Sequence, residues 1–224
     1  MKSKIAIIGY GNIAQAIAGD LTNNNHSVIL AGRDFTKAKA LSDKLGTLAR
    51  PMEIGAAIKE AHIIILAIWF NAIQPFFYQY EELLQKKIII DPSNPIAPDS
   101  KGGFVKTIDQ NESAGQLNAM LLPTHAILVK ALGTLSASSL SGSSNQKPDR
   151  TVLFYASDAL KVKHDVEELI CDMGFAPLYI GSIDQSIRLE VFGDLHEFSL
   201  GKSLSLEEAK ENIIKNTNPI NNNN

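Results

Sequence analysis

The chain has 224 residues, of which 45% are hydrophobic, and its formal net charge is −3. This length suits one large α/β domain with a small addition, and the mild acidity without a basic tract argues against nucleic acid as a partner. The single cysteine, Cys171, excludes an intramolecular disulfide and a cysteine-based zinc site, and no apolar run is long enough to span a bilayer. We therefore expect a cytoplasmic protein with no metal, no membrane segment and no targeting segment.

The N-terminus has the pattern of a strand, a tight turn and the start of a helix. The apolar run Lys4–Ile8 leads into Gly-x-Gly-x-x-Ala, formed by Gly9, Gly11 and Ala14. Gly9 allows the turn, Gly11 lets the backbone approach a pyrophosphate, and Ala14 lets the helix pack close to the strand. The free N–H groups at the helix start would face the phosphates. The motif predicts a dinucleotide site, and the alternative is a tight turn that binds nothing.

A second strand at His26–Ala31 completes a βαβ unit, and the residues after it indicate which dinucleotide binds. NAD sites place an Asp or Glu here for the ribose 2′-OH, whereas NADP sites have small residues and a nearby Arg. The chain reads Gly32-Arg33-Asp34, with Lys37 one helical turn further on. The guanidinium of Arg33 can bind a phosphate and Lys37 can add a second charge, so we predict NADP. Asp34 is either a helix cap or a ribose ligand.

Strands and helices continue to alternate as far as residue 91. The expected elements are a helix at Phe35–Leu45, a short strand at Thr47–Ala49, a helix at Met52–Glu60, a strand at His62–Ile68, a helix at Asn71–Leu84 and a strand at Lys87–Asp91. The apolar run from Ile63 to Ile68 lacks alternation, which is typical of a parallel strand buried on both faces. This order predicts a Rossmann-type doubly wound parallel sheet with right-handed crossovers.

The second half of the chain has a different composition. The proline-rich segment 91–98 follows a strand, at the edge where such sheets bind ligands. The serine-rich segment 133–150 suits a mobile loop or linker. The further expected elements are helices at 113–122, 160–173 and 185–198 and strands at 126–132, 151–156 and 176–180. Cys171, on the second of these helices, has the position of a buried small hydrophobe.

These patterns divide the chain into three parts. We expect a Rossmann domain that binds NADP at residues 1–140, a small appended α/β unit for the substrate site at 141–200, and a C-terminal tail at 201–224. In the tail, residues 205–208 resemble a capping box that opens a short helix, and residues 221–224 are expected to be disordered.

The motifs together resemble those of the coenzyme F420 (deazaflavin)-dependent NADP reductases, whose dinucleotide domain is similar to that of the transmembrane ferric reductases. The resemblance rests on residues 9–14, the Gly32-Arg33 turn with Lys37, and residues 67–69, 91–95, 129–137 and 173–177. It implies the following contacts: the pyrophosphate with Gly9, Gly11, Asn12 and Ile13, the 2′-phosphate with Arg33 and Lys37, and the nicotinamide with Ile68 and Trp69. Many relatives have Lys-Ala-Phe-Asn-Thr where this chain has Gly133 in place of the asparagine.

The resemblance implies hydride transfer between NADP(H) and a small-molecule acceptor, a flavin or deazaflavin as co-substrate, in a homodimer. This reaction needs mainly the alignment of two planar rings, so no catalytic residue is assigned. One alternative is a non-catalytic NADP-binding sensor or interaction module, which the change at Gly133 and the serine-rich segment favour. Another is a reductase of a small imine or carbonyl, which needs a proton donor such as His125. We otherwise expect His125 and His196 to be structural.

Overall fold

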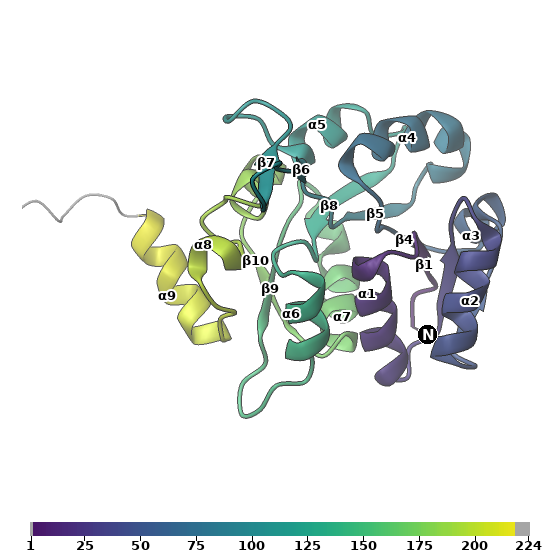
Figure 1. Ribbon diagram of the computed structural model, residues 1–224, viewed down its shortest axis with the longest axis horizontal. Coiled ribbons are helices and arrows are strands. Elements are labelled where there is room, and N and C mark those ends of the chain that lie inside the picture. The colour runs from purple at the N-terminus through teal and green to yellow at the C-terminus, as the bar shows by residue number, and fades with distance from the viewer. Residues whose placement is uncertain (1, 218–224) are drawn as a thin grey trace, which may run out of the picture.

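An eight-stranded sheet runs through the molecule, with helices on both of its faces (Figure 1). The computed structural model describes residues 2–217. The strands are β1 (Ile5–Ile8), β2 (Val28–Ala31), β3 (Ala49–Pro51), β4 (Ile63–Leu66), β5 (Ile88–Asp91), β8 (Ile127–Ala131), β9 (Val152–Ala156) and β10 (Ala176–Tyr179). Their order across the sheet is β10-β9-β8-β5-β4-β1-β2-β3, and all neighbours are parallel except β8 and β9. The predicted Rossmann-type fold is therefore confirmed.

The central strands are buried on both faces, as their unbroken apolar runs predict. In register, Ile5 of β1 pairs with Val28 of β2 on one side and with Ile63 of β4 on the other. Alternate side chains of a strand point to opposite faces. Ile5, Ile7 and Ile65 thus belong to one hydrophobic cluster. Ala6 and Ile64, which alternate with them along the same strands, belong to a second cluster on the other face.

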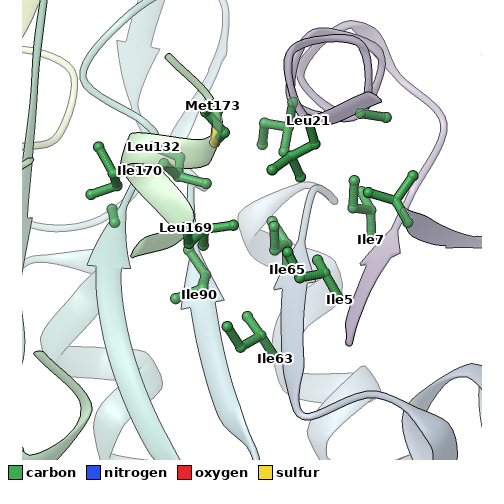
Figure 2. Packing of buried hydrophobic residues seen from close by; sticks show 14 of the residues in the cluster. Ile5, Ile7, Leu21, Ile63, Ile65, Ile90, Leu132, Leu169, Ile170 and Met173 are labelled. Carbon is green, nitrogen blue, oxygen red and sulfur yellow. The ribbon is translucent and has the colours of Figure 1, made fainter. Parts of the chain in front are cut away.

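Two sets of helices cover these clusters. The first face carries α1 (Asn12–Asn23), α2 (Phe35–Leu45), α6 (Ala137–Ser143) and α7 (Lys163–Asp172). The second carries α3 (Ile54–Glu60), α4 (Phe70–Leu84) and α5 (Ala114–Met120). Figure 2 shows the first face, where Leu21 of α1 and Leu169 of α7 lie over the isoleucines of β1, β4 and β5.

The segments after residue 140 extend the same sheet. The predicted boundary at this residue lies inside α6, and β9, the 3-10 helix at Leu160–Val162, α7 and β10 follow it. A separate two-stranded hairpin, β6 (Ile96–Pro98) and β7 (Phe104–Lys106), was not predicted.

The C-terminal part contains a 3-10 helix at Ile183–Arg188, then α8 (Glu197–Leu200) and α9 (Leu206–Thr217). The predicted capping box is present, because the N–H of Ser205 donates to Glu208 Oε2 at 2.8 Å and the N–H of Glu208 donates to Ser205 Oγ at 3.4 Å. The predicted disorder at residues 221–224 lies outside the described residues. Among residues 2–217, no helix has the length and apolar character that crossing a bilayer requires.

The serine-rich segment is not simply a mobile loop, contrary to our expectation. Residues 137–143 form α6, and Ser136 caps it by accepting a hydrogen bond from the N–H of Ser139 at 3.2 Å. Leu140 is fully buried in the cluster that also contains Ala14 and Ala18 of α1. One buried leucine, a serine cap and small side chains at the contact with α1 are enough to hold this short helix.

Two further predictions are wrong. Residues 185–198 do not form one helix, because Phe192 has a φ of +76° and a Cβ on Gly193 would collide with the carbonyl groups of Ile187 and Arg188. Cys171 is exposed, since the helical turn of α7 directs the neighbouring Ile170 into the core instead. Its thiol is nevertheless not activated: desolvation, the largest effect, raises its pKa above the usual value.

Candidate functional site

The turn between β1 and α1 has the geometry that its glycines predict. Gly9 has a φ of +129°, its N–H donates to the carbonyl of Ala31 at 2.8 Å, and a Cβ there would collide with the backbone of Ala67. Gly11 differs, because its φ of −74° suits any residue and no heavy atom lies within 4 Å of the position of a Cβ. The protein itself does not require glycine at position 11. The space beside Gly11 is therefore available to a ligand.

The first turn of α1 leaves its N–H groups without a side-chain cap. Gly11 occupies the N-cap position, and there is no acidic residue in the first turn. Asn12 is exposed and Ile13 is half-buried against the core. α1 is twelve residues long, and the N–H groups of its first turn have no side-chain partner, a combination that favours an anion at this end of the helix.

The end of β2 places two cations beside this turn. Arg33 is exposed and makes no hydrogen bond or ion pair within residues 2–217, so its guanidinium is available to a ligand. Lys37 is also exposed, with its Nζ 5.7 Å from the ring centre of Tyr10. Asp34 caps α2 by accepting from the N–H groups of Thr36 and Lys37 at 3.0 and 3.3 Å. Of the two roles considered for Asp34, the structure shows the helix cap.

The strand order explains why these groups face one crevice. The chain goes from β1 to β2 on one side and returns to β4 on the other, so the carboxyl ends of β1 and β4 flank a topological switch point. Ile68 and Trp69 follow β4, and the indole of Trp69 is 62% exposed. Arg33 thus lies on one side of the phosphate turn and Trp69 on the other. In sheets of this type, ligands bind in the crevice at such a switch point.

A buried ionic network, which no sequence pattern predicts, lies at the ends of β5 and β8. Lys130 Nζ lies 3.1 Å from Asp91 Oδ2 and 3.8 Å from Glu190 Oε1, and all three side chains are at least 98% buried. Lys130 also donates to the carbonyl of Ser93. Asn118 donates to Asp91 Oδ2 at 2.9 Å. Burial raises the pKa of Glu190, with Lys130 as the largest opposing influence.

Glu190 ties the C-terminal segment to α5. Its carboxylate accepts from the N–H groups of Ala114 and Gly115, each at 3.0 Å. The only sequence signal for this network was a charged residue at the end of each of two apolar strands, Asp91 and Lys130. Glu190 gave no such signal, because it lies within the predicted helix at 185–198, which does not form.

The histidines considered as proton donors have other positions or roles. His125 is exposed and precedes β8, so it lies at the amino edge of the parallel strands, opposite the crevice. His196 is buried, and its Nδ1 accepts from the N–H of Phe198 at 3.2 Å as the cap of α8. Burial lowers the pKa of His196. Both findings favour the structural roles expected for these residues.

Comparisons with known proteins agree with this site. Residues 4–95 match the family described as NADP oxidoreductase, coenzyme F420-dependent, and this segment contains all eight residues predicted to contact the dinucleotide. Metalloreductase STEAP3 of Rattus norvegicus is 27% identical over 187 residues, which are 84% of this chain but 36% of that protein. The chain therefore spans about a third of the length of the curated relative it matches.

Solved structures extend the likeness to most of the chain. A hypothetical protein from Sinorhizobium meliloti is 26% identical with a TM-score of 0.79, covering 91% of this chain and 95% of that one. A putative F420-dependent NADP reductase from an Arthrobacter species has the same fold, with a TM-score of 0.73 and 20% identity over 90% of this chain and 96% of that one. The family resemblance is thereby confirmed, and the matched family is of the enzyme class that the sequence predicts, the NADP-dependent oxidoreductases.

Proposed function

We propose that this chain binds NADP(H) across the carboxyl edge of its sheet and transfers a hydride between the nicotinamide and a planar flavin or deazaflavin acceptor. The observation that carries the proposal is the open space at Gly11, beside an uncapped twelve-residue helix and two exposed cations. A structural turn has no need of that combination, whereas a pyrophosphate with a 2′-phosphate nearby uses each part of it.

The residues present fit the dinucleotide. Backbone N–H groups from Gly11 to Ile13 would hold the pyrophosphate, and a side chain at position 11 would fill the space that the phosphates need. Arg33 and Lys37 would pair with the 2′-phosphate. Arg33 is exposed, and the ion pair of Lys37 with Asp34 is long, at 3.8 Å between Nζ and Oδ2, and lies at the surface. Ile68 and Trp69 would give the nicotinamide an apolar floor.

The cofactor, when bound, supplies the hydride. The chain's part is to orient two rings, to exclude water between them and to hold them at contact distance, which is how positioning alone accelerates such a reaction. A flavin or deazaflavin takes the hydride without needing an acid from the protein at the same moment. This agrees with the positions of His125, at the opposite edge, and His196, whose Nδ1 is used as a cap.

The same positions argue against the imine or carbonyl reductase, which needs a donor within hydrogen-bond reach of its substrate. The hypothesis of a non-catalytic sensor rested on Gly133 and the serine-rich segment, and the structure offers another reason for that glycine. A Cβ at position 133 would collide with the backbone of Pro92, so the residue is required by close packing of two strand ends. The homodimer remains a prediction of the resemblance.

The test is the absorbance of NADPH on mixing with riboflavin, FMN, FAD and a deazaflavin in turn. We expect oxidation with at least one of them, and a lower rate with NADH because Arg33 has no phosphate to bind. Gly11→Val is the inactive control. Tight binding of NADPH without oxidation by any acceptor would contradict the proposed hydride transfer and support a non-catalytic NADP-binding sensor.

A further inference from the structure

Phe192, in the turn that follows the 3-10 helix Ile183–Arg188, has an unusual conformation for an aromatic residue. Its φ is +76°, a conformation that bulky residues rarely adopt, and the residue is nevertheless 55% exposed. Phe192 thus combines a strained backbone with an aromatic residue that is more than half exposed. Strain of this kind persists where the surroundings impose it, and it gathers at ligand sites.

The surroundings of Phe192 do impose its conformation. Arg188 and Asp194 form a two-pronged ion pair across the turn, with Nε to Oδ1 at 3.0 Å and Nη2 to Oδ2 at 2.8 Å. The N–H of Gly193 donates to the carbonyl of Glu190 at 2.7 Å. Because Glu190 is itself fixed to α5 and to Lys130, the turn 188–194 has little freedom to relax.

Asn94 connects this turn to the carboxyl edge of the sheet. Its Oδ1 accepts from the N–H of Val191, next to Phe192, at 2.7 Å. Its Nδ2 donates to the carbonyl of Gly133 at 3.1 Å. The residue before Gly133, Leu132, also has a positive φ, +66°, at the end of β8. One amide therefore holds together two strained turns, on the side of the sheet where Trp69 and the nicotinamide would lie.

We propose that Phe192 is the acceptor-binding residue of this protein, whose exposed ring stacks on the planar ring of a flavin or deazaflavin, and that Asn94 is its positioning residue. The inference rests on the proposed function for the identity of the acceptor. A flat acceptor ring explains why the aromatic side chain of Phe192 is exposed and its backbone conformation fixed, since stacking depends on the orientation of the ring.

The test measures acceptor binding separately from turnover, by equilibrium dialysis of riboflavin, and of a deazaflavin, against the full chain saturated with NADP⁺. Phe192→Ala should raise the dissociation constant about tenfold, the size of one aromatic stacking contact. Phe192→Trp should leave it within about threefold of wild type. Binding of NADPH should be unchanged in both. Tyr78→Ala is the matched control, because Tyr78 is a comparably exposed aromatic on α4 and should have no effect.

A double-mutant cycle tests the role of Asn94. If Asn94 acts through Phe192, Asn94→Ala should raise the acceptor KM with little change in kcat, and should add little to Phe192→Ala. Asn94→Asp keeps a side-chain oxygen that can accept the hydrogen bond from the Val191 N–H, so it should raise the KM for the flavin less than Asn94→Ala does. Full additivity of the two alanine substitutions would overturn this role.

The outcomes also separate this inference from the proposed function. Riboflavin binding that depends on Phe192 in a protein that never oxidises NADPH would support the inference and contradict the function. NADPH oxidation by flavins, with the same acceptor affinity in wild type and Phe192→Ala, would support the proposed function and contradict the role of Phe192. A change in oligomeric mass on Phe192→Ala, with acceptor affinity unchanged, would assign the ring to a contact between copies and overturn the proposal.

Discussion

Asp20 makes the stability of the protein depend on pH near neutrality. It lies on α1, is 5% exposed, and its Oδ2 has no hydrogen-bond partner within the described residues. Burial raises its pKa from the usual 3.8 to about 7, and the polar side chain of Ser144, just after α6, opposes the shift in part. Ionising Asp20 therefore costs the folded protein on the order of 4 kcal/mol more than it costs the unfolded chain.

The sign follows from proton binding. Between pH 3.8 and about 7 the folded protein keeps the Asp20 proton and the unfolded chain loses it, so stability falls as pH rises through this window and then levels off. Asn in place of Asp20 keeps the shape and cannot ionise. Asp20→Asn should therefore match wild type near pH 4 and exceed it by up to about 4 kcal/mol above pH 7.

Urea unfolding of both proteins at several pH values between 4 and 9 measures this difference. Asp43→Asn is the control for losing a carboxylate in general, because Asp43 is exposed on α2. Parallel stability curves for wild type and Asp20→Asn, or an Asn variant less stable than wild type at pH 8, would refute the reasoning. The first result would mean that water reaches Asp20 between α1 and α6.

Three further predictions concern the cofactor site and the buried network. Gly11→Val should abolish NADPH binding in calorimetric titration while the protein stays folded, since its Cβ meets no protein atom, and affinity within about threefold of wild type would show that the turn is only structural. Arg33→Ala should weaken NADPH binding by about tenfold to a hundredfold and spare NADH, and a wild type that prefers NADH would contradict this role. Lys130→Met should lower the free energy of unfolding in urea by about 3–5 kcal/mol, because two buried carboxylates lose their cation. Adding Glu190→Gln should restore part of this stability. An unchanged free energy of unfolding in Lys130→Met would mean that water enters the network.

The dinucleotide half of the fold could be predicted because its signals are local. Apolar runs such as Ile63–Leu66 have one interpretation in a chain that alternates strands and helices, and Gly9 is needed by the backbone of its own turn. The placement of Arg33 after β2 follows from the same βαβ unit. These features depend on neighbours in the sequence, so the sequence alone specifies them.

The second half depends on contacts between distant residues, which no local pattern reveals. Glu190 is fixed by N–H groups of α5, 75 residues away in the sequence, and it lies in the segment 185–198, which does not form the predicted helix. The serine-rich segment contains one residue, Leu140, whose burial against α1 turns an expected loop into a helix. The role of Asn94 depends on Gly133 and Val191, which only the folded sheet brings together.

The most direct test of the account is the fate of the transferred hydrogen. NADPH deuterated at nicotinamide C4, on each face in turn, is mixed in a single turnover with the protein and a 5-deazaflavin, whose carbon centre does not exchange the hydrogen it receives. Direct hydride transfer predicts that one of the two labelled cofactors slows the reaction and delivers its deuterium to the reduced deazaflavin, as read by mass spectrometry. Reduced acceptor free of deuterium from both labelled cofactors would contradict direct transfer between two rings held together by this site.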